Sequence, residues 1–130
     1  MPQMYMEHEL DPKQEILKAL GDLSECPIFH NQVLLAIYIR PEKTKSGIIL
    51  TDKYRDEDKF QSKVGLVIKM GDLAFDDPKG AWFKGVEVDL HDWVIYRPSD
   101  GWSINYNGVN CRMLEDVNIR GKVPNPDMVW

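Results

Sequence analysis

Apolar and polar positions alternate in short runs along most of the chain, and this pattern predicts β-strands. In the first run, Val33, Leu35, Ile37 and Ile39 fall on one face. Pro41 ends that run, because proline has no N–H to donate to a neighbouring strand. The same alternation predicts further strands over 64–68, 86–90, 104–106, 109–111 and 117–123. The block 93–96 is apolar throughout, and we expect it to lie deep in the protein.

Turn residues separate these predicted strands. Asn107-Gly108 lies between two alternating runs and is the strongest hairpin signal in the chain. The run from Asp76 to Gly80 is also typical of a turn, and it predicts either the tip of a hairpin or a longer excursion. Several short strands with regular turns predict an all-β fold, a small barrel or a sandwich.

One helix is predicted before the strands. Asp11 is a good N-cap, Pro12 suits the first helical position, and Gly21 is a plausible stop. A helix of about ten residues is marginal alone in water, so it must pack on something. It either covers the Leu34 and Tyr38 face of the first strand or binds a neighbouring subunit. Its apolar stripe consists of Ile16, Leu17 and Leu20.

The segment 42–63 poses a second choice. A polar run from Glu42 to Ser46 is followed by a glycine and three aliphatic residues, and charged residues resume at Asp52. The aliphatic residues are either another strand or an apolar hook presented to a partner. The candidate partner-binding residues in this segment are Gly47, Ile48, Ile49, Leu50, Tyr54 and Phe60.

Length, charge and apolar content limit the classes of partner and compartment that we expect for this protein. The chain has 130 residues, which suits one domain, and a net charge of −5 without a basic stripe, so we expect no nucleic-acid partner. No apolar run approaches the length of a membrane span, and no export signal is visible, so the cytoplasm is the expected compartment. In that compartment Cys26 and Cys111 are expected to be free thiols.

Residues with catalytic or metal-binding potential do not form a recognisable set. Cys26 and His30 are four apart, but no second pair completes a zinc site. The acidic run from Asp56 to Asp58 lacks the spacing of a calcium loop and reads as a solvated charged loop. We therefore expect no catalytic residue, no metal and no cofactor, and a function that depends on binding other proteins.

Taken together, these residues resemble the GroES co-chaperonin family. The order and spacing of five segments carry the resemblance, which runs from about residue 27 to residue 123. They are Cys26–Leu34, Thr44–Leu50, Gly65–Ile68, Val88–Tyr96 and Leu114–Val117. The second segment is similar to the mobile loop of the family. The fourth has His91 where the family has a glycine, and histidine tolerates the positive φ that this turn requires.

The resemblance implies a small, partly open β-barrel over 26–123, with the loop at 42–63 and a roof hairpin at 72–86. It also implies a ring of identical subunits, in which the first strand of one subunit pairs with the last strand of the next. The roof hairpin here is aromatic, with Phe75, Trp82 and Phe83. An N-terminal arm (1–25) and a C-terminal tail (124–130) have no counterpart in ordinary co-chaperonins. The tail residues expected to bind partners are Met128, Val129 and Trp130.

Two functions follow from the resemblance, of which the first is the prediction and the second the alternative. The added arms and the charged loop are similar to those of GroES-like proteins encoded by tailed phages and prophages, which favours a virion protein that decorates the capsid. The retained Gly47-Ile48-Ile49-Leu50 favours instead a co-chaperonin that caps a GroEL-type chaperonin. In either case the partners are proteins (a capsid protein or a chaperonin, and copies of the chain itself), and nucleic acid and membranes are not expected.

Overall fold

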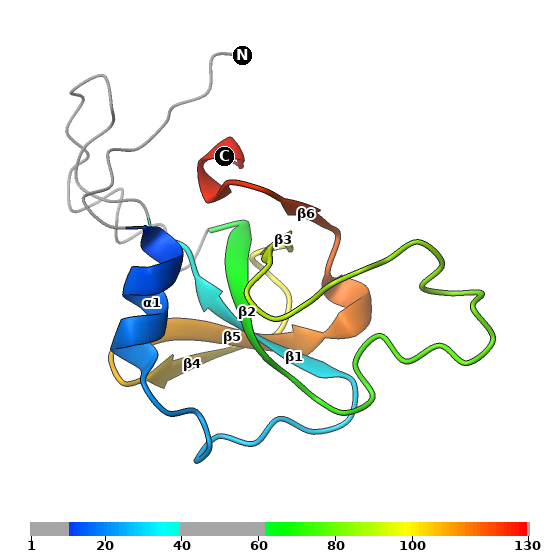
Figure 1. Cartoon of the computed structure of the whole chain (residues 1–130), viewed down its shortest axis with the longest axis horizontal. Coiled ribbons are helices and arrows are strands. Elements are labelled where there is room, and N and C mark those ends of the chain that lie inside the picture. Colours follow the sequence, from blue (N-terminus) through cyan, green and yellow to red (C-terminus); the bar gives the residue numbers. More distant parts are fainter. Residues whose placement is uncertain (1–10, 40–61, 130) are drawn as a thin grey trace.

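A six-stranded antiparallel sheet forms the centre of the computed structural model, which describes residues 11–39 and 62–129 (Figure 1). The strands lie in the order β4-β5-β1-β2-β3-β6, so β1 is central and pairs with both β5 and β2. Strands β4 and β6 form the two edges, and the sheet is not closed. The strands are β1 (Gln32–Ile37), β2 (Val64–Met70), β3 (Trp93–Ile95), β4 (Trp102–Tyr106), β5 (Val109–Glu115) and β6 (Gly121–Val123).

Both faces of the central strands are buried. The residues of β1 from Val33 to Ile37 are all buried, so alternate side chains enter two different apolar clusters. One cluster lies between the sheet and the N-terminal helix and includes Leu20, Leu34, Leu66 and Trp93. The other lies on the opposite face and includes Val33, Leu35, Val67, Val94, Tyr96 and Leu114. The predicted all-β class with one short helix is confirmed.

The helix α1 (Pro12–Leu20) forms where the sequence predicts it. The side chain of Asp11 accepts a hydrogen bond from the N–H of Lys13, and Gly21 ends the helix with a φ of 65°. Leu20 is fully buried in the first cluster together with Leu34 and Tyr38. Of the two alternatives for this helix, the described structure shows it packed on its own sheet. No helix in the described ranges has the length and apolarity needed to cross a membrane.

The hairpin β4–β5 confirms the turn predicted at Asn107-Gly108. Both residues have positive φ, 51° and 79°, as a two-residue hairpin turn requires. Tyr106 pairs with Val109 on either side of the turn. His91 likewise adopts a positive φ of 71°, as its position in the turn before β3 suggested.

The strand predicted over 86–90 is wrong. Residues 71–92 leave the sheet after β2 as a long excursion, seen on the right of Figure 1, and none of them is in a strand. Val86 and Leu90 are exposed, and only Val88 packs against the second cluster. The alternation of apolar residues therefore predicted a strand that does not form, because in the described structure residues 86–90 have no neighbouring strand to pair with. For the same reason the segment 72–86 carries turns rather than the paired strands of a hairpin.

The last predicted strand is shorter than expected. Residues Asp116–Asn118 form a 3-10 turn, and only β6, from Gly121 to Val123, joins the sheet. The turn forms because Asp116 bonds to residues far away in the sequence, as described below. The alternation of Val117 and Ile119 thus predicted that the strand begins at residue 117, whereas β6 begins only after the 3-10 turn, at Gly121.

The two cysteines are free thiols in the structure. Burial, and then the proximity of Cys26, raises the pKa of Cys111 to about 11 from 9.0. The unfolded chain therefore loses this thiol proton first, and we expect the free energy of unfolding to fall as the pH rises from about 9 to about 11.

This prediction is checked by urea unfolding across that pH range and by alkylation with iodoacetamide near neutral pH, read by mass spectrometry. Cys26, which is half-buried, is expected to react faster than Cys111 in the native protein. The variant Cys111→Ala should lose this part of the pH dependence. Equal alkylation of both thiols would contradict the burial of Cys111.

Candidate protein-interaction surfaces

The predicted partner-binding loop begins and ends at neighbouring strands. Its candidate residues Gly47, Ile48, Ile49, Leu50, Tyr54 and Phe60 lie outside the described residues. Its two ends are described. The Ser62 hydroxyl lies within hydrogen-bond distance of the carbonyl oxygens of Tyr38 (2.9 Å) and Val64 (3.1 Å), between which its one proton is shared. The N–H of Tyr38 donates to the Val64 carbonyl (3.1 Å). The barrel therefore fixes both ends of this loop at one place, at the end of the β1–β2 pair.

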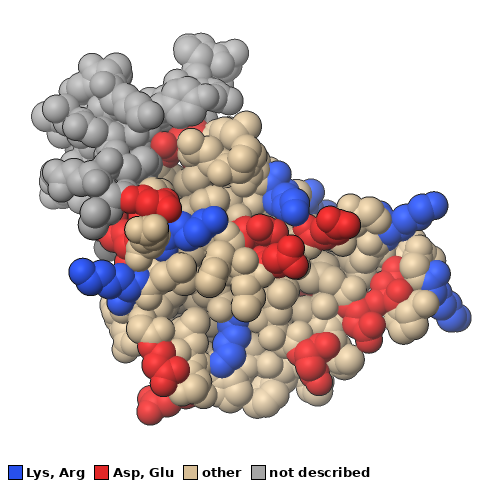
Figure 2. Space-filling view, in the orientation of Figure 1, with Lys and Arg blue, Asp and Glu red and all other residues tan. Residues whose placement is uncertain are grey.

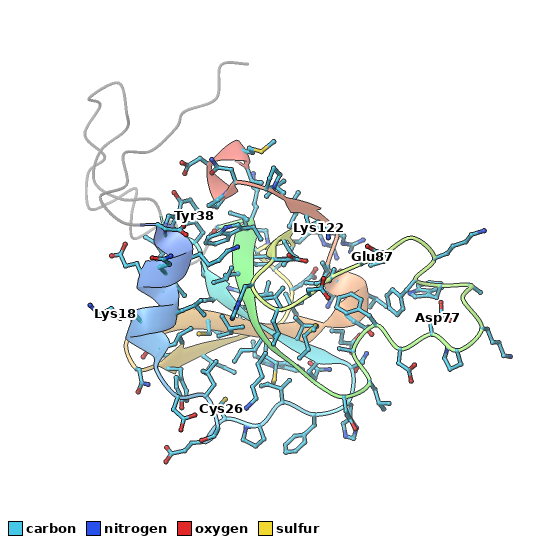
Figure 3. All side chains as sticks on the ribbon, in the orientation of Figure 1. Lys18, Cys26, Tyr38, Asp77, Glu87 and Lys122 are labelled. Atoms are coloured by element: carbon cyan, nitrogen blue, oxygen red, sulfur yellow. The ribbon has the colours of Figure 1, made fainter. Side chains whose placement is uncertain are left out.

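The aromatic residues of the excursion are held in a defined arrangement. The carboxylate of Asp77, labelled in Figure 3, accepts hydrogen bonds from the N–H groups of Trp82 (2.7 Å) and Phe83 (2.8 Å). These bonds, that from Phe83 most of all, lower the pKa of Asp77. The rings of Phe75 and Phe83 meet edge to face, with centroids 5.4 Å apart. Trp82 is left 73% exposed, so the excursion presents it to solvent.

A buried carboxylate joins the excursion to the barrel. Asp116 is only 4% exposed, and its two oxygens accept from the N–H of Phe75 (3.0 Å) and from the side-chain amide of Asn31 (3.3 Å). Its own N–H donates to the Asn31 carbonyl oxygen (3.0 Å). Sequence reasoning missed this residue, because its partners lie 41 and 85 positions away. A single side chain thus fixes the start of the excursion against the segment that precedes β1.

Side chains of the sheet hold the end of α1 and the turn after it. Asn107 donates to the carbonyl oxygen of Leu20 (2.6 Å), Tyr106 to that of Asp22 (2.7 Å) and Lys69 to that of Leu23 (2.7 Å). The first of these bonds satisfies a carbonyl of the last helical turn, and the other two hold the segment that follows the helix. Of the three predicted arm residues in the helix, Leu20 is fully buried in the protein's own core, and Ile16 and Leu17 are half-buried against it.

The C-terminal tail also packs on the barrel. The 3-10 helix η2 (Pro126–Met128) places the carboxylate of Asp127 where it accepts a hydrogen bond from the Tyr38 hydroxyl, and both residues are buried. Tyr38, labelled in Figure 3, follows the last residue of β1, and its ring forms a T-shaped pair with that of Trp93, with centroids 5.6 Å apart. Of the predicted tail residues, Met128 is exposed, Val129 is half-buried against the first cluster, and Trp130 lies outside the described residues.

Charged groups are interspersed on the surface. On the face shown in Figure 2, lysines and arginines lie among acidic residues and do not gather into one basic patch. No group of three or more potential metal ligands was found in the part of the chain that the structure describes. The buried guanidinium of Arg112 donates to the Asp100 carbonyl oxygen (2.7 Å) and lies 6.0 Å from the centre of the Tyr96 ring, so it is part of the core rather than a surface site.

Comparison with known proteins agrees with this architecture. The family model described as "Chaperonin 10 Kd subunit" matches residues 26–123, three quarters of the chain. A search of curated proteins finds no match. The matched range contains all six strands and both ends of the 42–63 loop, and it leaves out α1 and the C-terminal tail. The chain therefore belongs to the chaperonin 10 family, the family of the GroES co-chaperonins.

Proposed function

We propose that this protein is a co-chaperonin that caps a GroEL-type chaperonin and assists protein folding. The observation that carries the proposal is the family match over residues 26–123, a range within which Gly47-Ile48-Ile49-Leu50 falls. The anchoring of both loop ends at the β1–β2 pair supports it as well. The proposed partners are the chaperonin and further copies of the chain in a ring.

The energetics favour a ring over a single subunit. Burying each of the three aliphatic side chains in a groove of the chaperonin would contribute about 1.5–3 kcal/mol. Ordering the backbone of the loop costs about 1–2 kcal/mol for each residue fixed, so one loop binds weakly. Several loops on one ring convert the later contacts into intramolecular ones, and the combined affinity rises accordingly.

The alternative role, decoration of a phage capsid, was suggested chiefly by the two termini. Within the described residues, α1 and the tail pack on the protein's own barrel, and this weakens their interpretation as arms that reach a capsid. The capsid role remains a prediction. Mass spectrometry of purified particles tests it, since a structural protein must be found in them.

Replacement of Ile49 by aspartate is expected to abolish capping. A charged side chain cannot enter an apolar groove without a large desolvation penalty, and the ring multiplies the loss across all subunits. The measurements are binding to a GroEL-type chaperonin in the presence of nucleotide and the yield of a refolded client protein. The matched control Ile49→Val keeps an apolar side chain and should retain most activity. Equal activity of the two variants, or no binding by the unmodified protein, would refute the proposed function.

A further inference from the structure

The outer edge of β4 has backbone groups that pair with nothing in the described structure. Among the strands of residues 11–39 and 62–129, β4 forms one edge of the sheet and pairs only with β5. In a two-residue hairpin the residues flanking the turn exchange hydrogen bonds, and bonded and non-bonded pairs then alternate. Tyr106, Ile104 and Trp102 therefore bond towards β5, whereas Ser103 and Asn105 direct their N–H and C=O groups outwards. Within the described residues, no backbone hydrogen bond reaches those outward groups.

This edge lacks the features that usually prevent a strand from pairing with another molecule. Such features are charged side chains, proline, bulges or a very short strand. Strand β4 has five residues, Trp102-Ser103-Ile104-Asn105-Tyr106, with no charge and no proline, and its register with β5 is continuous. Trp102 is 65% exposed, and the side chains of Ser103 and Asn105 are exposed as well. The edge is thus open to another strand.

We propose that β4 is a self-association site, where it pairs antiparallel with β4 of a second copy about a twofold axis through Ile104. In this register Ser103 of each copy lies opposite Asn105 of the other, and these are the residues whose backbone groups point outwards. Four inter-chain hydrogen bonds then form, and no backbone group of the strand has to break a bond to β5. Ile104 faces its own counterpart as a non-bonded pair.

The side chains suit this symmetric register. Trp102 of one copy lies opposite Tyr106 of the other, on the same face as Ile104, so aromatic residues meet across the interface. Tyr106 is already held in place, because its hydroxyl donates to the Asp22 carbonyl oxygen (2.7 Å). On the other face the polar side chains of Ser103 and Asn105 meet. The strand thus matches itself on both faces, as an isologous contact requires.

Charge restricts the surfaces at which two copies can meet, and β4 is a surface that this restriction permits. The chain has a net charge of −5, so two copies repel each other over most approaches. Strand β4 is an uncharged strip and offers contact without placing like charges opposite one another. A strongly basic partner would gain nothing from this strip. Strand β6 lies at the opposite edge of the sheet and takes no part in this contact.

A pair of double variants tests the register. In Ser103→Glu/Asn105→Glu, like charges face each other twice across the proposed interface, whereas in Ser103→Glu/Asn105→Lys opposite charges do. Both variants place the same glutamate opposite Arg112 of their own hairpin, so their effects within one chain are matched at that position. Circular dichroism and thermal unfolding verify that both fold. The mass of each assembly is measured by light scattering after size exclusion, over a range of concentrations.

The expected result is that the unmodified protein and the Glu/Lys variant have twice the mass of the Glu/Glu variant, whatever the size of any ring. The dissociation constant of the Glu/Glu pair should be about tenfold or more higher than that of the Glu/Lys pair. Equal masses for all three proteins, or loss of pairing in both variants, would overturn the proposal. So would binding of an unrelated extended peptide at this edge while the chain itself stays unpaired. None of these outcomes bears on chaperonin capping. Failure of the self-association proposal can therefore be distinguished from failure of the proposed function, which the Ile49 variants test.

Discussion

Replacement of Gly71 by alanine is expected to lower the free energy of unfolding by about 3 kcal/mol or more, a large fraction of the stability of a typical domain. A Cβ atom at this position would lie 2.2 Å from the carbonyl oxygen of His30 and 2.7 Å from that of Phe29. Both atoms belong to the backbone, which cannot move aside as a flexible side chain can. Two hydrogen bonds also hold these backbone segments together: the N–H of Gly71 donates to the carbonyl oxygen of Gln32 (2.8 Å), and that of Leu73 to the carbonyl oxygen of His30 (3.0 Å). A backbone shift that relieved the clash would break them.

The control for this variant is Gly121→Ala. A Cβ atom at Gly121 would meet only the Cδ1 atom of Ile95 at 3.7 Å, an ordinary van der Waals distance. Urea unfolding followed by tryptophan fluorescence should therefore give a nearly unchanged midpoint for Gly121→Ala and a much lower one for Gly71→Ala. Similar midpoints for the two variants would show that the chain does not pass so close to Gly71.

Replacement of Asp116 by alanine should cost about 2–4 kcal/mol, because it removes the hydrogen bonds of two partly buried donors at once. These donors are the N–H of Phe75 and the side-chain amide of Asn31, and both then lack their partner. Because the first of them fixes the excursion, we expect faster amide hydrogen exchange over residues 72–90 as well as lower stability. At low denaturant concentration, where exchange occurs mainly through local opening, amide hydrogen exchange in β1 should increase less than exchange over residues 72–90.

Two matched variants isolate the role of this carboxylate. Asp116→Asn keeps one acceptor oxygen but turns an amide towards a donor, so an intermediate loss is expected. Asp72→Ala removes an exposed carboxylate from the same excursion and should change stability by less than about 0.5 kcal/mol. If Asp116→Ala behaves like Asp72→Ala, the excursion is not held by Asp116.

Local features of this fold could be predicted from the sequence because they depend on neighbouring residues. The cap at Asp11, the stop at Gly21 and the turn at Asn107-Gly108 each combine a few adjacent positions. The apolar residues of the first strand also identified β1, and they occupy both faces of the strand because both faces are buried. The same pattern over 86–90 predicted a strand wrongly, because alternation gives the possible faces of a segment but not whether a neighbouring strand exists to pair with it.

Contacts between residues far apart in the sequence could not be predicted. Asp116 and Asp127 have the sequence appearance of surface acids, yet both are buried and accept hydrogen bonds from residues far away in the chain, Asp127 from Tyr38 at a separation of 89 positions. Nothing near Gly71 in the sequence indicates that Phe29 and His30 cross it. In the candidate surface, the sequence identified Trp82 as part of an aromatic segment, but not the hydrogen bonds that the N–H groups of Trp82 and Phe83 donate to Asp77.

The short distance between Tyr38 and Ser62 has a consequence for how this protein tolerates changes of length. Neighbouring strands already bring these two positions together. The entropic cost of closing a loop between them therefore grows only with the logarithm of the number of residues in the loop. Doubling that length would cost about 0.6 kcal/mol. Insertions and deletions between the two positions should therefore alter reach and partner choice while the sheet keeps its stability, which makes this site a suitable place for a graft.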